Sequence, residues 1–204
     1  MDIHIFIDRI GKSFGERQLF ANISAELAGG QCLAVTGPNG SGKSTLLKII
    51  AGLVRPSSGQ IRLTLANGHT PRQQSAYTGL VAPDLAMYGA LTGIENIIFW
   101  TKLRGIACSR AEAGRLCLRV GLDRAEDEPA ATYSTGMKQR LKLAVLAGIN
   151  PPVWLLDEPS SNLDTGGRAM VKELIAGAAR RQSAIILATN ESEEAAYGNT
   201  KIEL

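Results

Sequence analysis

The chain has 204 residues, 45% of them hydrophobic, which is enough for one large core or for a core with a small subdomain. Its 22 basic and 19 acidic residues give a net charge of +3 and form no block of like charge, so nothing indicates a nucleic-acid partner. The longest apolar runs, such as Leu143 to Ile149, are far shorter than the ~20 residues that cross a bilayer, so any membrane role would require a partner. The three cysteines have no CxxC spacing, which argues against a zinc site or a redox pair.

The amino-terminal segment MDIHIFIDRI carries acids where a signal peptide would carry basic residues, so we expect a cytoplasmic protein. Its alternation of apolar and polar residues predicts a strand, which we expect to lie, with His4, at the edge of a sheet. Residues 1 to 35 as a whole alternate like antiparallel strands around the turn GKSFGE.

A glycine-rich segment, GPNGSGKST at Gly37 to Thr45, lies between an apolar run and a helical pattern. This is the P-loop pattern in its usual context of strand, loop and helix. Glycines let several backbone N–H groups converge on phosphate oxygens, and the following helix adds the positive end of its dipole. An ordinary loop with a capping Ser or Thr is the alternative, but a chance match in a chain of this length is expected only on the order of 1% of the time.

This segment is therefore predicted to bind a nucleoside triphosphate. Lys43 is expected to place its charge on the β- and γ-phosphates, and the Ser44 hydroxyl to bind Mg²⁺. The predicted nucleotide-binding residues of the segment are Gly37, Pro38, Asn39, Gly40, Ser41, Gly42, Lys43, Ser44 and Thr45.

The chain between the P-loop and residue 150 changes from a β pattern to a helical one. Residues 55 to 82 continue the strands, and from Leu91 to Gly121 the period becomes helical. The sequence YSTGMKQRL, at Tyr133 to Leu141, then opens a helical stretch that continues through Ala147. Taken alone, Ser134 is a plain N-cap before an amphipathic helix.

A second apolar run, VWLLDEP at Val153 to Pro159, suits a buried parallel strand and ends in two acids. Open α/β sheets bind ligands at the carboxyl ends of their strands. We therefore expect Asp157 to hold the Mg²⁺ shell through water and Glu158 to polarise the attacking water as a general base. An acidic turn after a strand is the simpler interpretation, and the P-loop upstream decides against it. A helix near Gly166 to Arg181 and a strand at Ala184 to Asn190 complete the pattern.

The order and spacing of these segments resemble those of the ATP-binding cassette (ABC) ATPases over almost the whole chain. YSTGM resembles the family signature, SNLD at Ser161 to Asp164 resembles its D-loop, and LTGIENIIF at Leu91 to Phe99 resembles the stretch that opens its helical subdomain. Phe14 matches the aromatic residue that stacks on adenine. The resemblance implies an α/β fold: a P-loop NTPase core with a mostly parallel sheet, an antiparallel β-subdomain and an α-helical subdomain at about 91–150, within one domain of residues 1–204.

The resemblance also implies how such a chain works. Two cassettes, most simply a homodimer, would enclose two ATP molecules, with the P-loop of one facing the signature of the other. Ser134 and Gly136 would then bind the γ-phosphate across the interface, at a helix N-terminus. The implied cofactors are ATP and Mg²⁺, and the implied partners are a second cassette and separate transmembrane permease subunits at the inner face of the cell membrane. The cargo would be chosen by the permease.

Three positions depart from the family pattern. Asn190 stands where a histidine usually follows the last core strand; its amide can donate a hydrogen bond to the γ-phosphate but cannot gain a proton near neutral pH. Ala82 to Asp84 fill the window of the usual glutamine, and Pro83 has neither an amide side chain nor an N–H. Thr135 and Met137 replace a glycine and a glutamine of the signature, as in some exporter ATPases. From Asn190 we expect slower or differently regulated hydrolysis, whereas the signature variant alone does not imply inactivity.

The leading hypothesis is an ATP-hydrolysing subunit of an exporter-like ABC transporter, with Glu158, Lys43 and Asn190 as catalytic residues. Two alternatives stay open. One is a soluble ABC ATPase that powers assembly of a complex without transport. The other is a nucleotide-gated switch that closes on ATP but barely hydrolyses it, which Asn190 and the missing glutamine favour and the intact Lys43, Asp157 and Glu158 oppose.

Overall fold

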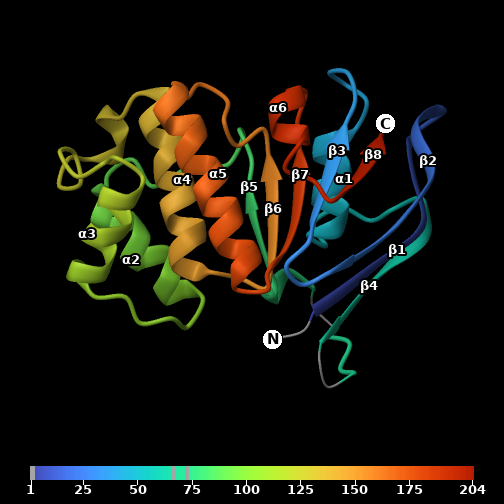
Figure 1. Cartoon of the computed structure of the whole chain (residues 1–204), viewed down its shortest axis with the longest axis horizontal. Coiled ribbons are helices and arrows are strands. Elements are labelled where there is room, and N and C mark those ends of the chain that lie inside the picture. The colour runs from blue at the N-terminus through green and yellow to red at the C-terminus, as the bar shows by residue number, and fades with distance from the viewer. Residues whose placement is uncertain (1–2, 66–67, 72–73) are drawn as a thin grey trace. The chain divides into compact units, whose positions relative to one another are not determined.

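The computed structural model describes residues 3–65, 68–71 and 74–204. Figure 1 shows the course of the chain, which divides into two compact units. The first consists of Met1–Leu80, Pro151–Glu158 and Ile175–Leu204, and the second of Val81–Asn150 and Pro159–Leu174. The first unit is built on two β-sheets, whereas the second is built mainly from helices.

A three-stranded antiparallel sheet forms one part of the first unit. Its strands are β1 (Ile3–Phe14), β2 (Arg17–Ala28) and β4 (Ser58–Leu65), in the order β2-β1-β4. Ile3, Ile5 and Ile7 alternate inward along β1 and are almost fully buried, as the period of two predicted. The prediction that this strand lies at an edge was wrong. The reason is that β4 returns from far along the chain and pairs with the second side of β1, placing Leu63 opposite Ile5.

The second sheet of this unit has five strands in the order β5-β6-β7-β3-β8. They are β3 (Cys32–Thr36), β5 (Thr78–Val81), β6 (Val153–Asp157), β7 (Ala184–Ala188) and β8 (Thr200–Glu203). The β3–β7, β3–β8 and β6–β7 pairs are parallel, and every residue of β6 and β7 is buried, as their short apolar runs predicted. The predicted α/β class, with a parallel core sheet and an antiparallel sheet, is confirmed. Sequence reasoning missed β8, because three of its four residues are exposed and no apolar run marks it.

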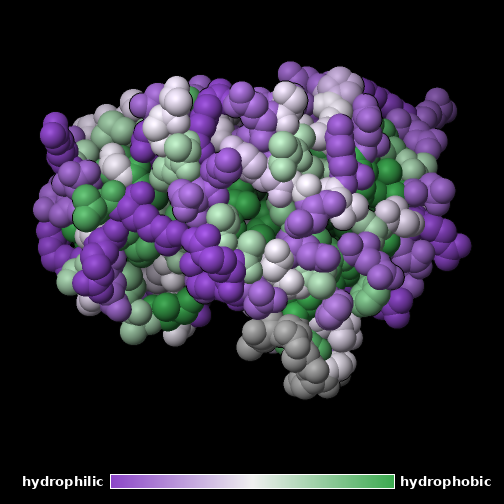
Figure 2. Space-filling model, viewed as in Figure 1, coloured by the Kyte–Doolittle hydropathy of each residue, from purple (hydrophilic) through white to green (hydrophobic). Residues whose placement is uncertain are grey.

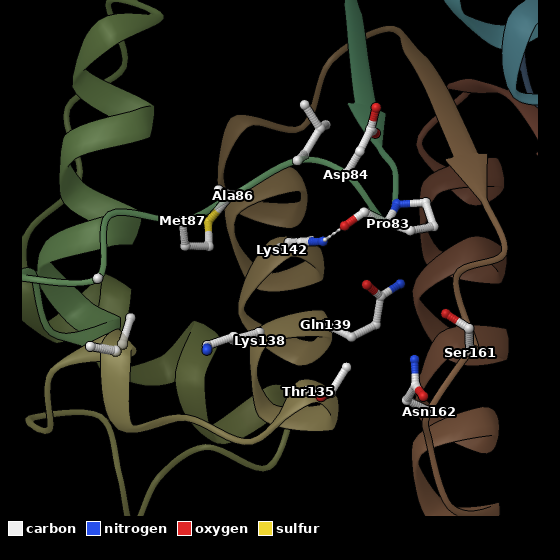
Figure 3. Close-up of a pocket in the computed structure, with 14 residues that line it drawn as sticks. Pro83, Asp84, Ala86, Met87, Thr135, Lys138, Gln139, Lys142, Ser161 and Asn162 are labelled. Atoms are coloured by element: carbon white, nitrogen blue, oxygen red, sulfur yellow. Dashed lines mark hydrogen bonds between the residues drawn. The ribbon is translucent and has the colours of Figure 1, made fainter.

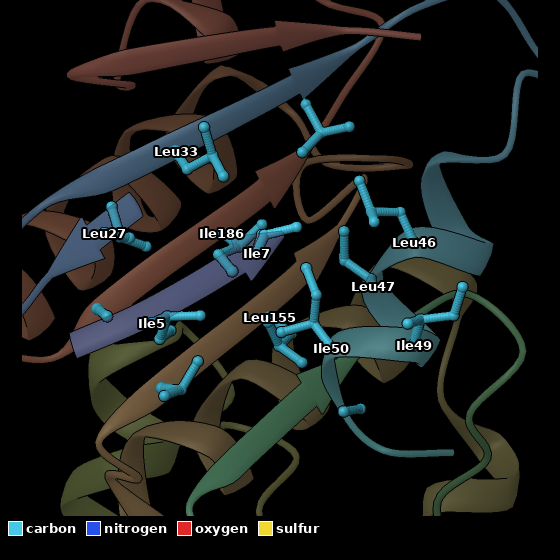
Figure 4. Close-up of a cluster of buried hydrophobic side chains, with 14 of the residues drawn as sticks. Ile5, Ile7, Leu27, Leu33, Leu46, Leu47, Ile49, Ile50, Leu155 and Ile186 are labelled. Carbon is cyan, nitrogen blue, oxygen red and sulfur yellow. The ribbon is translucent and has the colours of Figure 1, made fainter. Parts of the chain in front are cut away.

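The core of the first unit holds helix α1 (Lys43–Ile50) against β6 and β7. Figure 4 shows Leu46, Leu47 and Ile50 of α1 beside Leu155 of β6 and Ile186 of β7. All five side chains are at most 2% exposed. Since α1 follows β3 after only the P-loop, this packing fixes where the P-loop lies relative to the strand ends.

Three helices, α2 (Gly93–Leu103), α3 (Arg110–Arg119) and α4 (Thr135–Ile149), pack against one another in the second unit. Both α2 and α3 begin with a capping box, formed by Thr92 with Glu95 and by Ser109 with Glu112. The remaining helices are α5 (Thr165–Arg180), α6 (Ser192–Ala195) and two 3₁₀ turns, η1 (Gln74–Ala76) and η2 (Ala130–Thr132).

Polar and apolar side chains are mixed on the visible surface. On the face shown in Figure 2, hydrophilic side chains are interspersed with small apolar areas. Within residues 3–65, 68–71 and 74–204, no helix is both long and apolar enough to cross a bilayer.

Candidate functional site

The P-loop connects the end of β3 at Thr36 to the start of α1 at Lys43. Gly42 caps α1 with a φ of 110°, and an added Cβ there would lie 2.7 Å from the Phe20 ring, so this position requires glycine on two counts. Gly40 also has a positive φ, of 82°, but an added Cβ would meet nothing within 4 Å. The space beside Gly40 is therefore open to a ligand.

Lys43 lies in the first turn of α1 and is only 5% exposed. Its ammonium donates to the carbonyl oxygens of Gly37 at 2.7 Å and Pro38 at 3.2 Å, and to Oδ1 of Asn190 at 2.5 Å. A buried ammonium group needs such acceptors, because an unpaired charge away from water is costly. A phosphate chain that binds Lys43 must therefore replace some of these three acceptors.

Asn190 joins the P-loop to the acidic strand end. Besides accepting from Lys43, its Nδ2 group donates to Oδ1 of Asn39 at 2.5 Å and to Oε1 of Glu158 at 3.2 Å. We call these four side chains the Asn190 network. Sequence reasoning placed all four at the site but did not predict that Asn190 bonds to both Lys43 and Glu158.

The two acids lie at the carboxyl end of β6, as predicted. Asp157 is the last residue of β6, pairs in register with Ala188 of β7, and is 4% exposed. The N–H of Glu158 donates to the Ala188 oxygen at 2.9 Å, and its φ of 47° lies in the left-handed region. That conformation costs a non-glycine residue roughly 1–2 kcal/mol. Glu158 is thus held by its backbone and, through its side chain, by Asn190.

The residues around the P-loop suit a nucleotide. The Oγ atom of Ser41 is buried and has no hydrogen-bond partner among the described residues, as expected for a polar atom that a ligand completes. Phe14, at the end of β1, is 58% exposed, and the Lys12 ammonium lies 4.7 Å from its ring centroid. An exposed aromatic face can stack on a base. Thr45 lies in the first turn of α1.

The oxygen donors suit Mg²⁺. The Ser44 hydroxyl is exposed in the first turn of α1, and the Asp157 carboxylate lies at the end of β6. Both are hard ligands of the kind that Mg²⁺ takes. Among the described residues, no group of three or more His, Cys, Asp or Glu could hold a metal. Phosphate oxygens and water would therefore have to complete the shell around such an ion.

The signature residues lie in the second unit, at the start of α4. Ser134 is the N-cap, and its Oγ accepts from the N–H of Met137 at 3.2 Å, so the local prediction of a capping serine is confirmed. An added Cβ at Gly136 would lie 2.9 Å from the carbonyl oxygen of Asn162. Their predicted contact with a second molecule's nucleotide stays a prediction.

Side chains of α4 bond to three other segments of the second unit. Gln139 donates to the oxygen of Pro159 at 2.9 Å, and Arg140 to Oδ1 of Asp164 at 2.8 Å. Lys142 donates to the oxygens of Ala82 at 2.9 Å and Pro83 at 3.0 Å, in the segment that lacks the family's glutamine (Figure 3). Sequence reasoning missed Gln139 and Lys142; the signal for Lys142 was a charge between the apolar residues that flank it.

Gln139 and Lys142 line a cavity of about 350 Å³ in the second unit. Figure 3 shows side chains from the segment after β5, from α4 and from the SNLD loop around it. Its lining includes Pro83, Asp84, Met87, Thr135, Lys138, Gln139, Lys142, Ser161 and Asn162. The cavity thus brings the signature helix together with two other segments that the sequence singled out.

Comparisons with known proteins agree with these features. A family model described as "ABC transporter" matches residues 20–161. The cytochrome c biogenesis ATP-binding export protein CcmA of Rhodopseudomonas palustris is 38% identical over 177 residues, which cover 86% of this chain and 86% of the relative. The protein of the same name from Bradyrhizobium diazoefficiens is 40% identical over 177 residues, with 86% of each chain covered.

Solved structures show the same fold. The ATP-binding subunit of an ABC transporter superposes with a TM-score of 0.85 at 24% identity, covering 98% of this chain and 85% of that one. A dimeric ATP-binding cassette in a post-hydrolysis state, bound to ADP and phosphate, superposes with a TM-score of 0.83 at 23% identity, covering 98% and 94%.

Proposed function

Because the chain belongs to the ABC transporter family as an ATP-binding and ATP-hydrolysing subunit, we propose a specific role for it. In this role it works as one cassette of a homodimer, and ATP hydrolysis by the dimer energises export. Residues 1–204 would form one cassette, with a helical subdomain at about 91–150. The observation that carries the proposal is the Asn190 network, which joins the P-loop lysine and the strand-end glutamate through a single side chain.

The first unit would bind ATP in the P-loop. Lys43 leaves some of its present acceptors and pairs with the β- and γ-phosphates, while backbone N–H groups from Gly40 to Thr45 face the phosphate oxygens. Phe14 stacks on the adenine. Mg²⁺, held by the Ser44 hydroxyl and through water by Asp157, would neutralise charge on the phosphates.

Hydrolysis would depend on Glu158. Its carboxylate accepts a proton from the attacking water as a general base, and the Asn190 amide holds that carboxylate in place through the bond to Oε1. Because Asn190 also bonds to Lys43, binding of the γ-phosphate and placement of the base are linked through one side chain. Ser134 and Gly136 of the second cassette would complete the site from the other side.

The relatives suggest where this ATPase works. The two relatives described above are named as ATP-binding export proteins of cytochrome c biogenesis. We therefore propose that separate permease subunits hold this chain at the inner face of the membrane, and that closing and reopening of the cassette dimer drives an export step.

One observation favours a second candidate. The Asn190 amide oxygen accepts a hydrogen bond from the Lys43 ammonium, and the amide cannot gain a proton near neutral pH as a histidine can. A cassette that closes on ATP but turns it over slowly fits this feature.

The deciding experiment is steady-state ATP hydrolysis over a series of protein concentrations, with Glu158→Gln and Asn190→His as variants. A wild-type rate per subunit that rises cooperatively with concentration, and that Glu158→Gln abolishes, supports the dimeric ATPase. Wild type that binds ATP yet is as inactive as Glu158→Gln, while Asn190→His gains activity, supports the switch. Absence of ATP binding would contradict both.

A further inference from the structure

Helix α4 is the point where several functional segments of the second unit meet. The signature serine is its N-cap, and three polar side chains along the helix bond to other segments. Gln139 reaches Pro159, Arg140 reaches Asp164, and Lys142 reaches Ala82 and Pro83. The first two bonds go to the stretch that follows Glu158 in the sequence. The third goes to the segment where the glutamine is missing.

Lys142 is an unusual residue at its position. Its neighbours Leu141 and Leu143 are at most 1% exposed, and Lys142 itself is half-buried. Burial lowers the pKa of the Lys142 ammonium, and the charge of Asp84 acts in the opposite direction. The two carbonyl oxygens, at 2.9 and 3.0 Å, supply the acceptors that a partly buried ammonium needs.

The two bonds of Lys142 restrain the local backbone of the segment. The two acceptors belong to consecutive peptide units, so a single ammonium restrains both the position and the orientation of the backbone at Ala82 and Pro83. Pro83 lacks an N–H, so this stretch has fewer ways to form regular hydrogen bonds of its own. Lys142 therefore ties this segment to α4 through two hydrogen bonds.

We propose that Lys142 is a positioning residue for ATP hydrolysis, holding the Ala82–Asp84 segment to the signature helix so that the two move as one body. The proposal rests on the proposed function, since it assigns Lys142 to the ATPase cycle. A shift of the segment, caused by a partner or by nucleotide, would be passed directly to α4 and hence to Ser134. Lys142 contacts no reacting atom in this role.

Two substitutions and a control separate this role from a general loss of charge. Lys142→Met keeps the aliphatic stem but removes all donors, whereas Lys142→Arg keeps donors. Lys138→Met is the matched control: Lys138 lies on the same helix and lines the same cavity, but it is exposed and no hydrogen bond of its side chain is found among the described residues. Thermal unfolding of each variant would be recorded alongside.

The first measurement is hydrogen exchange of peptides covering residues 80–90, with and without ATP, which does not depend on turnover. We expect roughly tenfold faster exchange in Lys142→Met, as for loss of about one charge-assisted hydrogen bond, and wild-type exchange in Lys142→Arg and Lys138→Met. Unchanged exchange in Lys142→Met would overturn the proposal.

The second measurement is kcat and KM for ATP. We expect Lys142→Met to lower kcat roughly tenfold and to change KM less than about twofold, with Lys142→Arg recovering most of kcat. Faster exchange with an unchanged kcat would reduce Lys142 to a structural role and reject the proposal. If wild type binds ATP but does not hydrolyse it, the proposed function fails. The Lys142 proposal is then decided by hydrogen exchange alone. It is supported if ATP changes exchange in residues 80–90 and in the first turn of α4 together in wild type, but in only one of the two segments in Lys142→Met. It is rejected if the two proteins respond to ATP in the same way.

Discussion

Asn190→Asp is the most direct test of the site, because it replaces the amide NH₂ group with a charged oxygen and keeps the shape of the side chain. The carboxylate can still accept from Lys43, where the amide oxygen now accepts at 2.5 Å. It cannot donate, so the bond to Oε1 of Glu158 at 3.2 Å becomes a contact between two carboxylates. The substitution therefore strengthens the competitor for Lys43 and repels both Glu158 and an incoming phosphate.

The size of the effect follows from the 3.2 Å separation. Two unit charges at that distance repel by about 1 kcal/mol in bulk water and by about 5 kcal/mol at an effective dielectric constant near 20. Asn190 is exposed, so the lower figure carries more weight. Since about 1.4 kcal/mol corresponds to a factor of ten, a repulsion of about 1 kcal/mol should lower kcat/KM at least about fivefold.

The assay is ATP hydrolysis from about pH 5 to pH 8, compared with wild type at each pH. Two carboxylates in contact raise the pKa of one of them, so a proton enters the pair at lower pH and removes the repulsion. The activity of the variant relative to wild type should therefore rise as the pH falls. Asn190→Ala removes the same bonds without adding charge, and Asn39→Asp adds a charge that the Asn190 amide can still bond to, so both should be milder. Wild-type activity in Asn190→Asp, or a defect that grows as the pH falls, would refute the reasoning.

Three further outcomes are expected. Gly136→Ala should lower the thermal midpoint and the ATPase rate, because the added Cβ would lie 2.9 Å from a backbone oxygen, whereas Gly166→Ala, whose Cβ meets only one atom, at 4.0 Å, should be close to neutral in both assays. Phe14→Ala should raise KM for ATP roughly tenfold through lost stacking, with Phe14→Trp restoring it; an unchanged KM would remove Phe14 from the adenine site. Cys32 is only 3% exposed, and this burial raises the pKa of its thiol to about 12. When native protein is treated with iodoacetamide at pH 8, the more accessible Cys108 should therefore be modified first, which peptide mass spectrometry would detect.

Much of the core could be predicted because its signals are local. Short apolar runs at β3, β6 and β7 show buried parallel strands, and the glycines of the P-loop show a left-handed backbone without any knowledge of distant partners. The central place of β1 and the existence of β8 could not be predicted in this way. Both depend on pairing between segments far apart in the chain.

The site shows the same division. Residue types and order identified Lys43, Glu158 and Asn190, but not the bonds that Asn190 makes to both of the others. The charge of Lys142 between two apolar neighbours was visible in the sequence, but its role was not, because its acceptors in Ala82 and Pro83 lie 60 and 59 residues away in the chain.

The left-handed backbone at Glu158 sets stability and activity against each other at one position. Glycine adopts a φ of 47° without penalty, and asparagine does so more readily than glutamate. A selection of variants for heat resistance alone would therefore favour Glu158→Gly or Glu158→Asn, by up to roughly 1–2 kcal/mol, and would enrich proteins that have lost their general base. The presence of glutamate at this strained position indicates that the reaction, not the fold, determines which residue stands there.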